Sequence, residues 1–291
     1  MPGPGELTMF EDTTFALPAN FYDNYEGRQA AAGQEMSIAG DEMDLAFDLK
    51  LNSDGIKTRL KENLTFALKR LNPEERSEWN RIYDSVLNSF TKLNLRGREL
   101  AEWKYQRYMK DYLKCIRSVD NNIGRVLDYL KENNLLENTI VIYTSDQGFY
   151  MGEHGWFDKR FMYEESFRTP LVIQLPSSAG EFRKRGDIEQ FVQNVDYAPT
   201  ILELAGVKIP ADIQGESFVP LLKGKVPANW RKSVYYHYFE YPAEHSVRKH
   251  YGVRDSRYKL IRFYGDDIVT WELYDLDRDP SEMHNVYNNT S

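Results

Sequence analysis

A run of β-branched and apolar residues that ends abruptly in a polar loop constrains this chain more than any other feature. Residues 139–143 read TIVIY, and residues 145–148 read SDQG. A second apolar run, LVIQL at residues 171–175, closes the segment. β-branched residues favour strands, so the pattern predicts a strand, a polar loop and a second strand. This arrangement indicates an α/β fold, in which ligands bind beyond the carboxyl ends of strands.

The loop between these two runs carries unlike polar groups close together. His154, Asp158, Lys159 and the acidic pair Glu164-Glu165 all fall within it. Acids, an amide, a histidine and a lysine gathered at a strand end are typical of a functional site. However, loops are polar in any soluble protein, and Asp-x-Gly is a common turn signal. The pattern alone therefore leaves open whether the loop carries chemistry or only reverses the chain.

Helices are predicted before this segment. Apolar residues recur every three or four positions over residues 102–133, which predicts a long helix whose apolar stripe packs on the sheet. Asn72 and Pro73 form a helix start, with asparagine as the N-cap and proline in the first turn. We expect residues 50–100 to form a helical insertion on the surface of the main domain.

The last part of the chain shows a different pattern. A short helix is predicted over residues 195–205, ended by Gly206. Alternating residues separated by turn signals then predict an antiparallel sheet, with strands over residues 233–240, 251–255, 258–264 and 270–276. We therefore divide the chain into a main domain, residues 1–225, and a small α+β subdomain, residues 226–291.

Composition excludes some classes of partner. The formal net charge of −8 argues against nucleic acid. No apolar run approaches the roughly 20 residues that a membrane-spanning helix needs, so no membrane partner is expected. Met1-Pro2-Gly3 does not resemble the start of a signal peptide. Aromatic residues make up 14% of the chain, which suits stacking on sugar rings but equally suits a protein core.

Several of these segments together resemble one family. The stretches SDQG, GEHG and DKRFMYE in residues 145–164 are similar to the calcium and sulfate region of the type I sulfatases, enzymes of the alkaline phosphatase superfamily. Residues 112–130, 194–222 and 271–287 resemble further sulfatase segments in the family's order. The resemblance implies part of an alkaline-phosphatase-like α/β/α sandwich followed by a small C-terminal antiparallel sheet. It is strongest with glycosaminoglycan sulfatases, especially the N-acetylglucosamine-6-sulfatase group.

The resemblance also implies roles around the loop. Asp146 and Gln147 match calcium ligands, although the family usually has asparagine or histidine where Gln147 stands. Lys159 matches the catalytic lysine that binds the sulfate group. His154 is expected either to orient the loop or to touch substrate. The implied cofactors are one calcium ion and a formylglycine, and the implied partner is a sulfated carbohydrate; the oligomeric state stays open.

The C-terminal part offers further candidates. In several sulfatases this subdomain borders the substrate pocket, so His245, Arg248 and His250 are candidate sugar contacts. The alternative is that they line a sheet surface, because exposed histidine and arginine are ordinary surface residues.

Some family features have no counterpart in this sequence. Formylglycine arises from cysteine or serine in C/S-x-P-S-R, but this motif is absent, and the only cysteine, Cys115, lacks the Pro-Ser-Arg tail. The family's Asp-Asp metal pair is also missing. We therefore expect the chain to begin inside a sulfatase, after the first sheet strands, with a periplasmic, secreted or lysosomal location implied by the resemblance. Two alternatives remain: a truncated, inactive protein that binds sulfated sugar, and a phosphoester or phosphonate hydrolase of the same superfamily.

Overall fold

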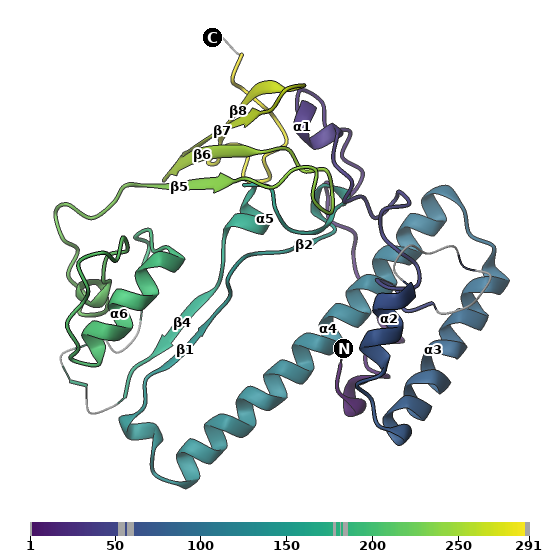
Figure 1. Ribbon diagram of the computed structural model, residues 1–291, viewed down its shortest axis with the longest axis horizontal. Helices are drawn as coiled ribbons and strands as arrows, with labels where there is room; N and C mark the ends of the chain where they lie inside the picture. Colours follow the sequence, from purple (N-terminus) through teal and green to yellow (C-terminus); the bar gives the residue numbers. More distant parts are fainter. Residues whose placement is uncertain are drawn as a thin grey trace.

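The computed structural model describes residues 2–51, 56, 61–176, 179–180, 182 and 186–288 of the 291-residue chain. Figure 1 shows α2, α3 and α4 on one side of the strand pair β1 and β4, α6 on its other side, and a separate sheet near the C-terminus. The helices are α1 Gln29–Ala32, α2 Lys61–Leu68, α3 Pro73–Leu93, α4 Gly97–Glu132, α5 Glu164–Phe167, α6 Tyr197–Leu204 and α7 Val219–Leu222, with 3-10 turns η1 Pro4–Glu6, η2 Leu136–Asn138, η3 Glu153–Gly155 and η4 Asn194–Asp196. The strands are β1 Val141–Thr144, β2 Tyr150–Met151, β3 Phe157–Asp158, β4 Leu171–Gln174, β5 Ser233–Tyr238, β6 His250–Asp255, β7 Tyr258–Tyr264 and β8 Val269–Asp275.

Helices α2 and α3 form the expected helical region. The predicted start of α3 is confirmed: the Asn72 side chain accepts a hydrogen bond from the Glu75 amide at 2.9 Å, and the Glu75 carboxylate accepts one from the Asn72 amide at 2.9 Å. This reciprocal capping satisfies two backbone donors that a helix start otherwise leaves unpaired. Trp79 and Tyr83 stack on the buried face of α3, with ring centroids 3.9 Å apart. Residues 52–55 and 57–60 of the region lie outside the described residues.

The long helix is confirmed as α4, but its packing differs from the prediction. Ala101 and Tyr105 in its first half are buried in a core shared with Phe21 and Phe157. Apolar side chains in its second half, however, are exposed to solvent: Ile116, Val119, Val126 and Tyr129. The prediction that the whole stripe packs on the sheet is therefore wrong for this half, because no described strand lies against it.

Strands β1 and β4 pair with each other in antiparallel orientation, with Val141 opposite Gln174 and Thr144 opposite Leu171. On one face, Leu171 and Ile173 pack against a cluster of Phe218, Leu221, Leu222 and Trp230 beside α6 and α7. Helix α6 ends as predicted, before Gly206, which has a positive φ of 68°. The described part of the α/β sheet is thus one strand pair with one covered face.

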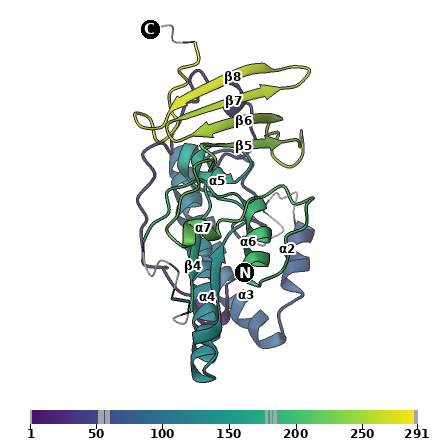
Figure 2. The ribbon, with the colours of Figure 1, turned by 90° about the vertical axis from the view of Figure 1, so that its left-hand side faces the viewer.

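The C-terminal strands form one antiparallel sheet in the order β5-β6-β7-β8, as predicted. Figure 2 shows this sheet lying across one end of the molecule. Its inward-facing side chains alternate along each strand, as in Ile261 and Phe263 on β7, which are fully buried. The opposite face carries exposed residues such as Tyr235 and Val253.

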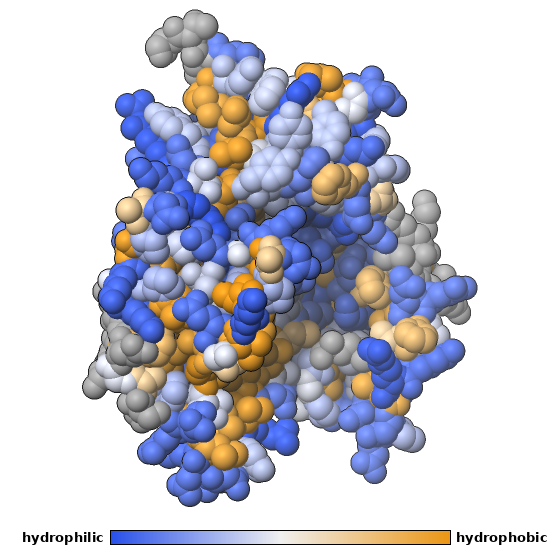
Figure 3. Space-filling model, turned by 60° about the vertical axis from the view of Figure 1, so that its left-hand side comes forward, coloured by the Kyte–Doolittle hydropathy of each residue, from blue (hydrophilic) through white to orange (hydrophobic). Residues whose placement is uncertain are grey.

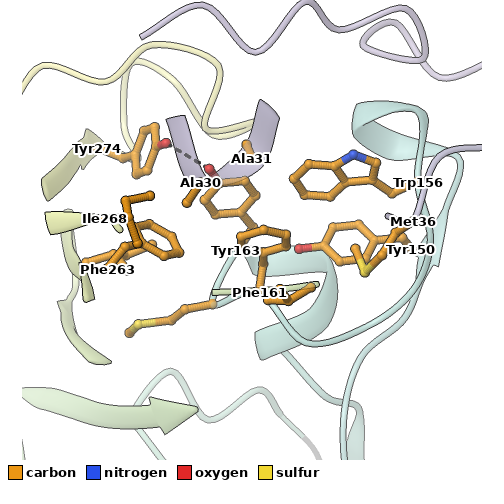
Figure 4. Close-up of a cluster of buried hydrophobic side chains, with 13 residues drawn as sticks. Ala30, Ala31, Met36, Tyr150, Trp156, Phe161, Tyr163, Phe263, Ile268 and Tyr274 are labelled. Carbon is orange, nitrogen blue, oxygen red and sulfur yellow. Dashed lines mark hydrogen bonds between the residues drawn. The ribbon is translucent and has the colours of Figure 1, made fainter. Parts of the chain in front are cut away.

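The inner face of this sheet packs on the loop that follows β2 rather than on a core of its own. Trp156, Phe161 and Tyr163 from the loop stack on one another and meet Phe263 and Tyr274 from the sheet (Figure 4). A segment far away in sequence, Ala30, Ala31 and Met36, completes this cluster, which we call the C-terminal core. The core therefore spans the boundary that we placed at residues 225 and 226, and the boundary stays a prediction.

Among the described helices, none has both the length and the apolar composition that crossing a lipid bilayer requires.

Candidate active site

The polar loop after β1 is held by backbone contacts. The Ser145 hydroxyl donates to the Gln147 carbonyl at 2.8 Å, and the Asn194 amide donates to the Asp146 carbonyl at 2.7 Å. The Gly148 amide donates to the carbonyl of Ser166 at 2.8 Å. A Cβ atom on Gly148 would lie 2.0 Å from the Glu165 carbonyl oxygen, so only glycine fits there. These contacts fix the backbone of the loop while the Asp146 side chain stays exposed.

Lys159 lies near this loop. It follows directly after β3, and its side chain is 36% exposed. The ammonium nitrogen lies 3.5 Å from an Asp158 carboxylate oxygen and 6.0 Å from the ring centroid of Phe149, the residue after Gly148. The structure thus brings together Lys159 and the segment that carries Asp146 and Gln147, and it leaves the lysine accessible to a ligand.

Asp158, one of the polar residues of this loop for which the sequence indicated no separate role, is the centre of a charged cluster. Its carboxylate accepts from the Arg160 guanidinium at 3.0 Å and lies 3.0 Å from His245 Nε2. Burial acts to raise the pKa of the Asp158 carboxyl, but the hydrogen bond from His245 and the charges of Arg160 and Lys159 outweigh it and lower that pKa. Asp158 is therefore ionised at neutral pH and contacts the side chains of Lys159, Arg160 and His245.

The backbone at this cluster is unusual. Asp158 has a φ of 70° and Arg160 a φ of 111°, although neither is glycine. Such conformations cost free energy and persist only where the surrounding contacts impose them. They are frequent at ligand sites, so the geometry supports a functional role for the loop. A sequence cannot reveal this strain, and the only local signal is the run of opposite charges in Asp158-Lys159-Arg160.

His245 is the candidate sugar contact that the structure places in this cluster. Its Nδ1 lies 2.8 Å from the Glu35 carbonyl oxygen, and its Nε2 faces Asp158. Both ring nitrogens therefore face oxygen atoms, one of a backbone carbonyl and one of a carboxylate. The side chain is 8% exposed, which leaves a small edge within reach of a ligand.

Arg248 is fixed by other contacts. Its guanidinium forms two ion-pair contacts with Asp267, at 3.0 and 2.8 Å, and lies 4.2 Å from the ring centroid of Tyr241. Such a paired and stacked guanidinium is pre-organised and still able to donate further hydrogen bonds. Whether it contacts a sugar stays a prediction.

His154 is fully buried, so its side chain does not reach a surface ligand in this structure. Its Nδ1 lies 2.8 Å from an Asp23 carboxylate oxygen, and Asp23 forms a 2.5 Å ion pair with Arg28. Burial lowers the pKa of His154, against the opposing hydrogen bond to Asp23. Of the two roles left open by the sequence, the structure favours orientation of the loop.

His250 is also fully buried, among the rings of Tyr238, Phe161 and Phe263. Its Nδ1 donates to the Arg248 carbonyl at 2.7 Å, and burial lowers its pKa to about 4. A neutral ring enclosed by aromatic side chains does not contact substrate here. We therefore withdraw His250 as a direct sugar contact in this conformation, because the C-terminal core covers it.

The residues present do not make a complete metal site. Calcium takes six or more oxygen ligands, and Asp146 with Gln147 offers one carboxylate and one amide. Within the part of the chain that the structure describes, no three His, Cys, Asp or Glu side chains gather closely enough to hold a metal ion. Cys115, the sole cysteine, is half-buried on α4 and lacks the formylglycine motif. We therefore derive no chemical step through calcium or formylglycine from this chain.

Comparisons with known proteins agree with this fold. The family model "Sulfatase" matches residues 14–207, and the model "N-sulphoglucosamine sulphohydrolase, C-terminal" matches residues 152–291. The two matches together cover nearly the whole chain. The class of protein defined here is the α/β proteins with an alkaline-phosphatase-like fold. The chain belongs to the sulfatase family.

Individual relatives sharpen this assignment. The chain is 49% identical to the N-acetylglucosamine-6-O-sulfatase of Bacteroides thetaiotaomicron, over 99% of its own length and 51% of that protein. A solved structure, described as a complex with its substrate D-glucosamine-2-N,6-O-disulfate, superposes with a TM-score of 0.90 at 48% identity, over 99% of this chain and 58% of the other. The chain thus spans about half the length of these relatives.

A more distant relative has a different activity. The phosphonate monoester hydrolase of Agrobacterium radiobacter superposes with a TM-score of 0.56 at 26% identity, over 79% of this chain and 44% of the other.

Proposed function

We propose that this chain is part of a sulfatase that hydrolyses sulfate esters on glycosaminoglycan-type carbohydrates. The observation that carries the proposal is the similarity to a protein named N-acetylglucosamine-6-O-sulfatase, which extends over 99% of the chain. The accessible ammonium of Lys159 beside a strand end supports it, because a fixed cation stabilises charge on sulfuryl oxygens. The chain spans half of that relative, so activity requires residues beyond those that match.

We assign roles to this chain's residues as follows. Lys159 binds the sulfate oxygens, and Asp158 holds this part of the loop in place through its contacts with Arg160 and His245. His245 and Arg248 contact the sugar. His154 acts indirectly, by fixing the loop between β2 and β3.

Asp146 and Gln147 contribute part of a calcium site whose other ligands come from outside the described residues. The adjacent side chains supply two oxygen donors at a strand end, which supports this role, whereas two donors alone would hold calcium weakly.

The experiment that tests this function measures release of inorganic sulfate from 6-O-sulfated N-acetylglucosamine. The enzyme is the protein that carries this chain in its native reading frame. We expect Lys159→Ala to reduce kcat by about 100-fold or more, because it removes a cation that acts on the developing charge. The matched control is Lys232→Ala, an exposed lysine that should leave kcat unchanged. Equal kcat in both variants would remove Lys159 from the mechanism.

Two alternative functions predict different results when cleavage and binding are both measured. A phosphonate monoester hydrolase would cleave a phenyl phosphonate monoester with a higher kcat/KM than the sulfated sugar, and the similarity to the Agrobacterium enzyme keeps this candidate open. A protein that binds sugar without turnover would show saturable binding of the sulfated sugar but no sulfate release. In that case Lys159→Ala would still weaken binding, because the ammonium contacts the sulfate group.

A further inference from the structure

The segment that joins β5 to β6, residues 239–249, lies against the charged cluster around Asp158. His245 Nε2 lies 3.0 Å from an Asp158 carboxylate oxygen, and the Arg160 guanidinium lies 3.3 Å from a Glu240 carboxylate oxygen. These two contacts fix the segment beside the proposed sulfate site. We call residues 239–249 the rim.

Tyr241 is an aromatic side chain of the rim that solvent reaches. It is 39% exposed, and the Arg248 guanidinium lies 4.2 Å from its ring centroid. Arg248 is in turn held by two contacts with the Asp267 carboxylate, at 3.0 and 2.8 Å. A tyrosine ring that is already ordered loses little conformational freedom when a ligand stacks on it. Tyr241 therefore offers a preformed flat surface to a ligand.

Glu240, the residue before Tyr241, adds a fixed hydrogen-bond acceptor. Its side chain is 63% exposed, and its Oε2 is held by Arg160 at 3.3 Å and by the Tyr238 hydroxyl at 3.3 Å. An ionised carboxylate accepts several hydrogen bonds, so Glu240 can also accept from hydroxyl groups of a ligand. Figure 3 shows that the surface around the C-terminal sheet is largely hydrophilic, in blue. An exposed ring beside a fixed acceptor suits a ligand with apolar faces and hydroxyl edges, which is the chemistry of a sugar ring.

We propose that Tyr241, with Glu240 beside it, forms a subsite for the sugar that adjoins the sulfated one, so that the substrate is an oligosaccharide rather than a free monosaccharide. The proposal rests on the proposed function, because it takes Lys159 as the residue that binds the sulfate group. Glu240 contacts Arg160, which contacts Asp158. Asp158 in turn lies 3.5 Å from the Lys159 ammonium. Three successive contacts thus separate the rim from Lys159, so the sulfated sugar lies between them and the next sugar reaches Tyr241.

The test compares two substrates of the protein that carries this chain in its native reading frame. One is the monosaccharide 6-O-sulfated N-acetylglucosamine, and the other is a tetrasaccharide that ends in the same sulfated residue. Release of inorganic sulfate gives kcat/KM for each, and the measured quantity is the ratio of the tetrasaccharide value to the monosaccharide value. We expect a wild-type ratio of about ten or more, because contacts with a remote sugar also lower the energy of the transition state. Equal kcat/KM values for the two substrates of the wild type would overturn the proposal.

Tyr241→Ala should lower this ratio about fivefold, because it removes the ring on which the second sugar stacks. Tyr241→Phe keeps the ring and should keep the ratio. Phe239→Ala is the matched control: Phe239 is 66% exposed in the same rim, but its ring stacks on His237, with centroids 3.8 Å apart. It should keep the wild-type ratio. A substitution that only disturbs the fold lowers kcat/KM for both substrates alike, so an unchanged ratio in Tyr241→Ala contradicts the subsite.

A binding measurement separates failure of the subsite from failure of the proposed function. If the wild type releases no sulfate from either substrate, the proposed function is wrong, and isothermal titration calorimetry with the same two carbohydrates decides the subsite. Tighter binding of the tetrasaccharide that Tyr241→Ala weakens about fivefold, and that Phe239→Ala leaves unchanged, supports the subsite. Equal Kd values for the two carbohydrates, or equal effects of the two substitutions, would exclude it.

Discussion

The strand pair β1–β4 and the sheet β5–β8 are both antiparallel, yet they differ in what their side chains contact. Ile261 and Phe263 on β7 are fully buried, whereas Val172 on β4 is 61% exposed. The sheet rests on the aromatic loop of residues 156–163, and the pair has a covering layer on one face only. Backbone pairing alone therefore does not create a core, because the stabilising burial comes from the layer packed on a strand.

The largest expected effect on the free energy of unfolding comes from Lys259 and the two carboxylates that it contacts beneath the sheet. Lys259 is fully buried, donates to the Met162 carbonyl at 2.7 Å, and lies 2.8 Å from carboxylate oxygens of both Glu164 and Glu282. Lys259→Met removes the ammonium from Glu282 and leaves Glu164 paired with Arg254 alone, so we expect a loss of about 3–5 kcal/mol in the free energy of unfolding. Urea denaturation measures this loss. The control Lys232→Met, at an exposed position, should change the free energy of unfolding by less than about 0.5 kcal/mol.

Truncation of apolar side chains compares the two sheets directly. Ile261→Ala should lower the free energy of unfolding by about 2–5 kcal/mol, because it truncates a fully buried side chain of the C-terminal core. Val172→Ala in the chain alone should change the free energy of unfolding by less than about 0.5 kcal/mol. Denaturant titration of both variants checks the contrast. Similar losses would mean that the strand pair is covered in solution.

The pH dependence of the free energy of unfolding tests whether Glu272, a buried acid of the sheet, holds a proton in the folded state. Burial raises the pKa of Glu272 to about 7, against the opposing hydrogen bonds from Tyr163 and Tyr274, each at 2.7 Å. Between its ordinary pKa of 4.5 and about 7, the folded state holds a proton that the unfolded chain has lost. The stability contributed by this group is therefore present at low pH and lost as the pH rises toward 7.

We expect Glu272→Gln to reduce the loss of stability between pH 5 and pH 8 by about 1–3 kcal/mol. Urea unfolding at the two pH values measures this difference. Glu99→Gln, at an exposed position on α4, is the control and should keep the wild-type pH dependence. A Glu272→Gln curve that parallels the wild type would show that Glu272 is ionised in the folded protein.

The smallest effect belongs to the helical region, which serves as a reference for the two sheets. Asn72→Ala removes the side-chain acceptor that caps α3 and should cost about 1 kcal/mol. Asn88→Ala, at an exposed interior position of the same helix, should be neutral or slightly stabilising because alanine is the better helix former. Thermal unfolding of the two variants measures these changes in the free energy of unfolding.

The sequence predicted those parts of the fold that depend on neighbouring residues. The strand runs at β1 and β4, the cap at Asn72 and the four C-terminal strands each have a local periodicity or a local capping signal, and the structure confirms them. Short elements such as β2 and β3 were not predicted, because two-residue strands carry no measurable period.

Contacts between distant segments could not be predicted. The insertion of Ala30 and Met36 into the C-terminal core depends on the arrangement of the whole chain. The same holds for the burial of His154 and His250, since their sequence context reads as polar loop and strand edge. The position of Lys159 beside the strand-end loop was expected from motif resemblance, whereas the central place of Asp158 required the structure.

Lys259 also has a consequence for the kinetics of folding. It joins β7 to Met162, which lies 97 positions earlier in the chain, so its contacts form only after distant segments have met. Interactions absent from the folding transition state act on the unfolding rate rather than the folding rate. The buried ammonium therefore has little effect on the folding rate. It lowers the unfolding rate and so lengthens the time for which the sheet and the aromatic loop stay packed together.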